Sequence, residues 1–289
     1  MVPCAITSLS DDDHMAGPRS KRPQPNSGPR VVDLSDSDGD SDVEPIPMRL
    51  APTVGKRAFI EVFAGSHHLS DAFSAGGHRV FPMDVKLSIE HDMHGLSGIK
   101  LLKETVAALT LETGMRPYIH FAPPCSTYSM ARFPKIRSST HPSGLPGKLL
   151  DSHNKEILAH ANRITINTFR VMTELFHDKC LVSLEQPSTS LMLKTKEFKS
   201  WASQSGAASI TVDYCMFGMP YRKRTSVWTS PPGFLDKLER KCPGDHIHER
   251  TLSGWSYNKG SRLPTSHGCS AYPEQLCAAW CRAFACLSL

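Results

Sequence analysis

Long apolar runs are missing from this chain of 289 residues. No stretch approaches the ~20 apolar residues that a membrane-spanning helix needs, so we expect no membrane segment. An apolar leader is missing too, because the acids Asp11 to Asp13 lie where its hydrophobic part would have to be. The nine cysteines have no regular spacing, which argues against a secreted disulfide framework. We therefore expect a soluble protein of a reducing, intracellular compartment.

Charge is not evenly distributed along the chain. Residues 1–56 hold nine acidic and six basic side chains, whereas residues 57–289 hold 19 acidic and 27 basic ones, a net charge of +8. A basic body suits a polyanion such as nucleic acid, although this charge is also ordinary for solubility. Residues 1–56 are rich in Pro, Ser, Asp and Gly and lack apolar periodicity. They are predicted to form a disordered acidic tail before one domain of residues 57–289.

One short island interrupts this tail. Val31, Val32 and Leu34 form a β-prone apolar core, and alternating Ser and Asp residues follow it. Such a segment can add a strand to the sheet edge of another protein. It resembles a SUMO-interacting motif and predicts a SUMO-type partner; a plain acidic linker explains it equally well.

Strand-like and helical patterns alternate through residues 57–289. This alternation predicts an α/β fold with a mostly parallel sheet and helices on both faces. The expected strands are 59–63, 79–83, 118–122, 181–184, 210–212 and 225–228, and the expected helices are 69–75, 99–112, 151–176, 194–203 and 272–285.

The apolar run 118–122 ends at Pro123 and Pro124, and Cys125 follows. Two prolines stop a strand, so the pattern predicts a buried strand that opens onto a rigid loop. The thiol would lie at the carboxyl edge of the sheet, where α/β proteins bind ligands. A single cysteine is often a packing residue, but the prolines and the hydroxyl residues that follow favour a nucleophile.

The first strand-to-helix turn is Phe63-Ala64-Gly65-Ser66, and Asp84 comes 19 residues after Gly65. Small residues let a nucleotide-like ligand approach the backbone, and an acid about 20 residues later can bind ribose hydroxyls. Asp92 adds a polar group to the same region. A purely structural turn is the alternative.

Glu185 lies in Leu184-Glu185-Gln186-Pro187, a second strand end that proline blocks. A carboxyl group held there with partial burial would have a raised pKa and could donate a proton. A helix-capping carboxylate is the alternative. Because Cys125 and Glu185 both follow strands, we expect them in one cleft.

Arg222, Lys223 and Arg224 lie between two strands. Three cations at this place suit phosphate contacts, and a solvated turn is the alternative.

Four more cations, Arg132, Lys135, Arg137 and Lys148, lie in the long loop after Cys125. This loop has glycines and prolines and no core pattern, which predicts a mobile basic lid over a polyanion. Together with Lys223, these side chains are the predicted nucleic-acid contacts.

Cys242, His246, His248 and Cys269 form a Cys-x3-His-x-His set that is followed by a distant cysteine. Cysteine and histidine are the ligands of structural zinc. The spacing matches no standard zinc finger, so we expect no metal here and keep zinc as the alternative.

In chain order these motifs resemble the cytosine-5 DNA methyltransferase family, over about residues 59–228. The resemblance implies a Rossmann-like, S-adenosylmethionine-dependent fold with a seven-stranded sheet. It also implies a nuclear enzyme that acts on DNA, with RNA as an alternative substrate. It assigns S-adenosylmethionine binding to Phe63, Ala64, Gly65, Ser66, Asp84, Asp92 and Pro124.

The same resemblance makes Cys125 the nucleophile that attacks cytosine C6 and Glu185 the group at N3. Arg222 and Arg224 take the places of the arginines in a Gln-x-Arg-x-Arg motif. Pro220 to Arg224 is one residue shorter than that motif, with Tyr221 in place of the glutamine.

Two departures support a different hypothesis. Ser66, His67 and His68 replace further glycines of the cofactor loop, and only about forty residues are left for a target-recognition domain. The alternative is a catalytically decayed methylase fold that serves as a nucleic-acid- or chromatin-binding module. A cysteine hydrolase that pairs Cys125 with a histidine is a third hypothesis.

Overall fold

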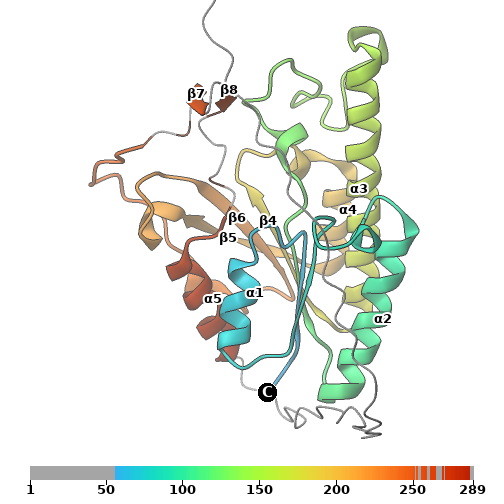
Figure 1. The fold of residues 1–289 in the computed structure, drawn as a ribbon, viewed down its shortest axis with the longest axis vertical. Coiled ribbons are helices and arrows are strands. Elements are labelled where there is room, and N and C mark those ends of the chain that lie inside the picture. The colour runs from blue at the N-terminus through green and yellow to red at the C-terminus, as the bar shows by residue number, and fades with distance from the viewer. Residues whose placement is uncertain are drawn as a thin grey trace, which may run out of the picture. The chain divides into compact units, whose positions relative to one another are not determined.

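The structure is a computed structural model, and it describes residues 56–250, 252, 255–258, 261–264, 269 and 271–286. Apart from Lys56, the predicted disordered tail lies outside the described residues, and so does the island at Val31, Val32 and Leu34. In the described part, the chain forms an α/β fold with one large mixed sheet (Figure 1).

Six strands form this sheet in the order β2-β1-β3-β4-β6-β5. The first four are parallel neighbours, whereas β6 is antiparallel to both β4 and β5. The strands are β1 (Phe59–Val62), β2 (Val80–Met83), β3 (Tyr118–Phe121), β4 (Leu181–Pro187), β5 (Ala208–Asp213) and β6 (Arg224–Ser230). A separate two-stranded ribbon pairs β7 (Trp255–Asn258) with β8 (Ser261–Pro264).

The expectation of a seven-stranded sheet was therefore wrong by one strand in the described chain. The segment after β2 forms a short 3₁₀ helix at Ile89–His91 and then enters a long helix, so it adds no strand. The strand β6 is reversed because only ten residues, 214–223, separate it from β5. A connection this short joins antiparallel neighbours, whereas a parallel crossover needs a dozen or more residues.

Helices cover both faces of the sheet, as the alternating pattern predicts (Figure 1). The helices α1 (His68–Ala75) and α5 (Glu274–Ala285) share one core with Phe59, whereas α2 (Leu96–Thr113), α3 (Ser152–His177) and α4 (Lys196–Ser205) share the other with Ile60. Successive β1 residues thus enter opposite cores, which is why apolar residues occur on both faces of this strand. None of the described helices combines the length and the apolar character needed to cross a membrane.

The helix α3 begins where the sequence predicts. The Asp151 side chain accepts a hydrogen bond from the Asn154 amide at 2.7 Å, which satisfies one of the free N–H groups of the first turn. The helix then runs for 26 residues beside the loop that follows Cys125.

Glu61 is a buried acid in the middle of β1 and is 1% exposed. Its Oε2 atom accepts hydrogen bonds from the Ser70 amide at 2.9 Å and the Ser70 hydroxyl at 2.5 Å, which joins α1 to β1. Burial raises the pKa of Glu61 to about 7, although the Ser70 hydrogen bonds oppose the shift. This contact holds the turn between β1 and α1 in place.

We expect the variant Glu61→Gln to become more stable relative to the parent protein as pH rises. A raised pKa in the folded state stabilises the protein below the ordinary value of 4.5, and this contribution is lost as pH rises through about 7. The free-energy difference between the two proteins should change by about 3 kcal/mol across this range, since one pKa unit corresponds to about 1.4 kcal/mol. Urea unfolding at a series of pH values measures it. Glu104→Gln, on the exposed side of α2, is the control, and an equal pH response in both variants would contradict the account.

Candidate functional site

The carboxyl ends of the parallel strands and the start of β6 meet at one edge of the sheet. In the register, Phe121 of β3 lies beside Leu184 of β4, and Glu185 lies beside Val227 of β6. Because β6 runs in the opposite direction, the residues just before it lie where β4 ends. Lys223 therefore reaches the same edge as Cys125 and Glu185.

A cavity of about 580 Å³ opens at this edge. It is lined by residues 63–66 after β1, Pro124 and Cys125 after β3, Glu185 of β4 and the cations 222–224 before β6. This volume suits a small-molecule site, for which a few hundred cubic ångströms is usual. The predicted nucleophile, the predicted acid and the first turn are thus brought together in one cavity.

Glu185 is the buried acid of this cavity, with 7% of the residue exposed. Its Oε1 atom has no hydrogen-bond partner among the described residues and lies 3.8 Å from Nζ of Lys223. Burial raises the pKa of Glu185, and the Lys223 charge opposes this shift without cancelling it. The carboxyl group is therefore suited to hold a proton and to donate it to a ligand in the cavity.

The thiol of Cys125 responds to the same two charges. Burial raises its pKa, a charged Glu185 raises it further, and Lys223 lowers it. Lys223 itself stays protonated: burial lowers its pKa, but the attraction of Tyr214 and Glu185 outweighs burial and raises it overall. Since one ammonium group faces two acidic groups, a proton on Glu185 favours the thiolate of Cys125.

Gln186 joins the two segments that carry these groups, a role that sequence reasoning missed. Its side chain is fully buried; Nε2 donates to the Pro123 carbonyl at 2.7 Å, and Oε1 accepts from the Ser190 hydroxyl at 2.8 Å. The end of β4 is thereby joined to the loop that carries Cys125. The Glu-Gln-Pro motif was the available signal, because a buried amide side chain at a strand end needs hydrogen-bond partners from the neighbouring chain.

The turn after β1 has an unusual backbone. Phe63, Gly65 and His67 have φ values of 66°, 56° and 64°, in the left-handed region that glycine adopts most readily. The Gly65 amide donates to Asp84 Oδ2 at 3.0 Å, so the acid after β2 holds the turn. Asp92 accepts from the His94 amide at 2.8 Å. Neither acid is among the residues that line the cavity.

Arg222 and Arg224 line the cavity but are already paired. Asp213 is fully buried and accepts from Arg224 Nη2 at 2.7 Å and from Arg222 Nε at 3.4 Å. It also accepts from the Cys242 amide at 2.8 Å. Burial raises the pKa of Asp213, yet these hydrogen bonds and charges lower it overall. The cation that faces Glu185 is therefore Lys223, which lies between the two arginines in the sequence.

The loop after Cys125 is held against α3. Arg137 is 2% exposed; its Nη1 atom donates to the Pro142 carbonyl at 2.8 Å and to Asn162 Oδ1 at 2.9 Å, and its guanidinium lies 3.7 Å from the Tyr128 ring centroid. Arg132 donates to Asn154 at 3.2 Å. Lys135 bonds the Met130 carbonyl and Lys148 is exposed. Arg137 thus ties the loop together rather than facing solvent.

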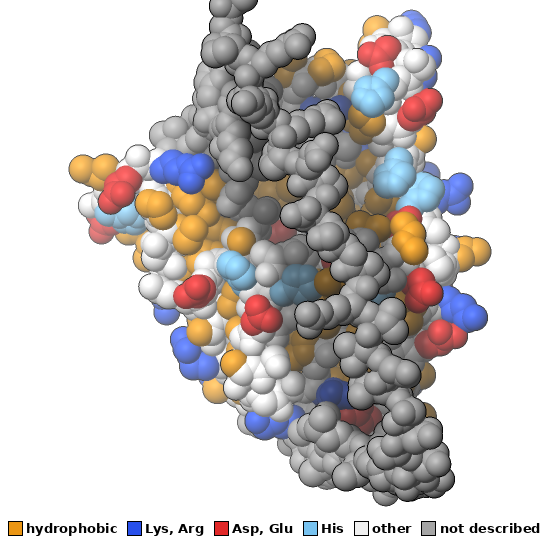
Figure 2. Space-filling view, viewed as in Figure 1, with side chains coloured by type: hydrophobic (Ala, Val, Ile, Leu, Met, Phe, Trp, Pro, Cys, Tyr) orange, Lys and Arg blue, Asp and Glu red, His pale blue; other side chains and the backbone are white. Residues whose placement is uncertain are grey.

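Basic side chains on the visible face do not gather in one place. Among the described residues in Figure 2, Lys and Arg are interspersed with Asp and Glu. The cations beside the cavity are therefore more informative about a ligand than the net charge is.

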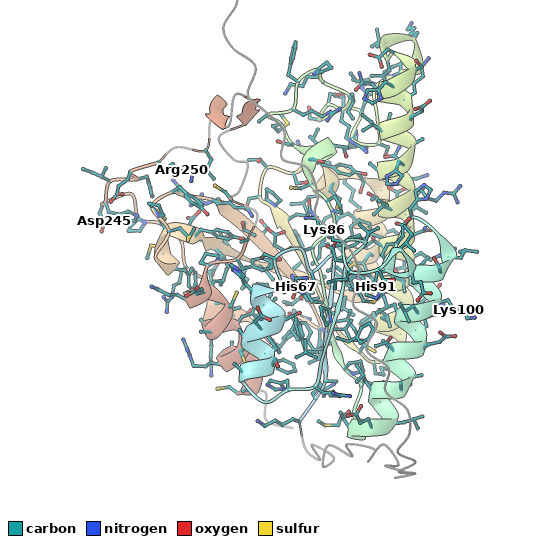
Figure 3. All side chains as sticks on the ribbon, in the orientation of Figure 1. His67, Lys86, His91, Lys100, Asp245 and Arg250 are labelled. Carbon is teal, nitrogen blue, oxygen red and sulfur yellow. The ribbon has the colours of Figure 1, made fainter. Side chains whose placement is uncertain are left out.

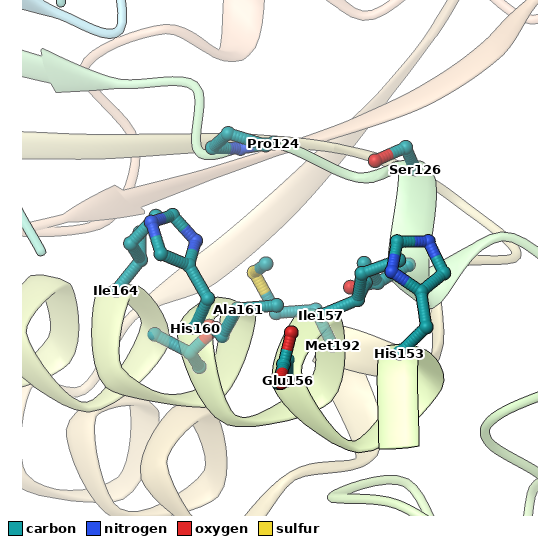
Figure 4. A pocket seen from close by; sticks show the side chains of 11 residues that line it. Pro124, Ser126, His153, Glu156, Ile157, His160, Ala161, Ile164 and Met192 are labelled. Atoms are coloured by element: carbon teal, nitrogen blue, oxygen red, sulfur yellow. The ribbon is translucent and has the colours of Figure 1, made fainter. Parts of the chain in front are cut away.

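A second cavity of about 410 Å³ lies between α3 and the loop residues Pro124 and Ser126. His153, Glu156 and His160 project from α3 at its border (Figure 4). Neither Cys125 nor Glu185 lines it.

Comparison with known proteins adds little to this geometry. The chain matches no protein-family model and no curated protein sequence. Among solved structures it is similar to the methyltransferase EhMeth of Entamoeba histolytica, with 14% identity and a TM-score of 0.39. The match covers 68% of this chain and 57% of that one, so this chain spans less than two thirds of its length.

The shared electrostatics of Cys125, Glu185 and Lys223 can be measured on the thiol. We expect Glu185→Gln to lower the pH at which Cys125 reacts with iodoacetamide, and Lys223→Gln to raise it, because the first removes a negative charge and the second a positive one. Mass spectrometry of the peptide that contains Cys125 follows the reaction. Lys100→Gln, exposed on α2, is the control. The same midpoint in all four proteins would show that the three groups are not coupled.

Proposed function

We propose that this chain is an S-adenosylmethionine-dependent cytosine-5 methyltransferase that acts on DNA. The observation that supports the proposal most is that one cavity holds the half-buried Cys125 and the buried Glu185, with Lys223 at 3.8 Å from the carboxylate. A nucleophilic thiol and a carboxyl group with a raised pKa are the two groups that addition to a cytosine ring requires.

The proposed chemistry begins with the thiolate of Cys125. Its sulfur forms a bond to C6 of the base while the proton of Glu185 binds N3, and the electrons of the C5–C6 double bond move to C5. Lys223 stabilises the carboxylate that Glu185 leaves behind. Once C5 carries the methyl group, a base removes the C5 proton, the C5–C6 double bond re-forms, and the S–C6 bond breaks to restore the thiolate. The proton on N3 returns to Glu185, so both groups end in their starting states.

The turn after β1 fits the cofactor. Phe63 and Ala64 border the cavity beside Cys125, and the left-handed turn leaves the Gly65 side of the backbone open, since an added Cβ would meet only the Phe63 carbonyl at 3.9 Å. Residues 63–66 and Pro124 would therefore hold S-adenosylmethionine. When bound, this cofactor supplies the electrophilic methyl group that the activated C5 takes up.

DNA is the proposed substrate because the described domain is basic and cations border the cavity. Arg222 and Arg224 keep side-chain exposures of 39% and 43% while they pair with Asp213, so their outer N–H groups can meet phosphate oxygens. A cytosine in a duplex would have to leave the stack to reach Cys125, at a cost of a few kcal/mol.

Transfer of a labelled methyl group from S-adenosylmethionine tests this proposal. We expect the label to be incorporated into DNA by the parent protein. Cys125→Ser should reduce incorporation to background, because the serine hydroxyl is a far weaker nucleophile than a thiolate near neutral pH. Cys286→Ser is the matched control, since this cysteine is exposed at the end of α5 and should leave transfer unchanged.

Two other outcomes would replace the proposal. Cofactor binding by calorimetry without transfer to DNA or RNA would contradict methylation of nucleic acid. Salt-sensitive DNA binding without any cofactor binding would favour the decayed fold as a binding module, for which the paired arginines would supply the phosphate contacts.

A further inference from the structure

Four potential metal ligands lie close together just after the end of β5. They are Cys215, Cys242, His246 and His248, and their ligand atoms all lie within 4.8 Å of one another. Cys215 belongs to the 3₁₀ helix Tyr214–Phe217, whereas the other three lie on the irregular segment 241–248. Side chains from two separate segments therefore meet at one point.

The distances fit a tetrahedral ion. The Cys242 sulfur lies 3.5 Å from His248 Nε2 and 3.7 Å from His246 Nε2. Zinc bonds of about 2.3 Å to sulfur and about 2.0 Å to nitrogen, at a tetrahedral angle, separate the two ligand atoms by about 3.5 Å. A neutral thiol and an imidazole gain little from such a contact, because S–H is a weak donor.

Neighbouring groups already orient the ligands. Asp245 Oδ1 lies 3.2 Å from His246 Nδ1, which leaves Nε2 of that ring directed at Cys242. A carboxylate behind a ligating histidine is the usual arrangement in zinc sites. Asp245 itself lies near the outer tip of the segment (Figure 3).

We propose that Cys215, Cys242, His246 and His248 bind one structural zinc ion. Two thiolates and two imidazoles in tetrahedral positions are the ligand set that zinc prefers, and four protein ligands leave no open position for catalysis. The proposal corrects the sequence-based set: Cys215 takes the place of Cys269, which lines the main cavity instead. Because 26 residues separate Cys215 from Cys242, the short spacing of the other three ligands does not reveal Cys215.

The ion would have a structural role, because backbone hydrogen bonds and regular secondary structure hold only the first part of this segment. Residue Arg240 runs beside β5, where it bonds the backbone of Asp213 and Thr211, and the Cys242 amide bonds the Asp213 side chain. Beyond residue 242 the segment forms neither helix nor strand until after residue 250. A metal at this point would fix the segment against β5 and hold Asp213, the partner of the two cavity arginines.

Metal analysis of the purified full chain tests the proposal without any assay of activity. We expect about one zinc per chain by elemental mass spectrometry, since a closed four-ligand site binds tightly. Replacement by Co²⁺ should give the intense visible bands of a tetrahedral site and a thiolate-to-cobalt band in the near ultraviolet. Cys242→Ser and His248→Asn should lose the metal, whereas Cys286→Ser should keep it.

Two results would contradict a zinc site. Wild-type protein from zinc-supplemented cells with no bound metal, no cobalt spectrum and a melting temperature unmoved by chelator would overturn the proposal. So would a disulfide between Cys215 and Cys242 in freshly purified protein. If a ligand variant fails to fold, the cobalt titration of the wild-type chain still decides between these results.

Discussion

The ammonium group of Lys223 is the interaction on which the candidate site depends. It lies 3.8 Å from Glu185, and its charge acts on both that carboxyl group and the Cys125 thiol. Burial alone would keep both acids protonated, and one cation can offset only one negative charge. A proton on Glu185 therefore frees Lys223 to favour the thiolate. The site is arranged for one nucleophile and one proton donor at the same time.

The fold creates this arrangement through the direction of one strand. The strands β3 and β4 deliver Cys125 and Glu185 at their carboxyl ends, and the reversed β6 delivers Lys223 at its start. Gln186 fixes the loop of Cys125 to β4, and Glu61 fixes the first turn to α1. Each contact is a buried hydrogen bond, so its loss would leave an unpaired polar group in the core.

Much of this could be predicted from the sequence because apolar runs that end at proline mark strand ends. This rule placed Cys125 and Glu185 correctly after β3 and on β4, and the alternating pattern gave helices on both faces. Other features depend on contacts between distant residues, which spacing does not reveal. Arg222, Lys223 and Arg224 look alike in sequence, but the buried Asp213 pairs with the two arginines, whereas Lys223 lies beside Glu185 and Tyr214. Arg137 was expected in a mobile lid, but Tyr128 and Asn162 hold it inside the protein.

Trapping the covalent complex would show whether Cys125 attacks cytosine as we propose. DNA that contains 5-fluorocytosine cannot lose the fluorine at C5, so the protein should stay attached to it when S-adenosylmethionine is present. We expect a DNA adduct that mass spectrometry maps to Cys125 and that is absent in Cys125→Ala. An adduct at another residue, or none from protein that binds both cofactor and DNA, would contradict it.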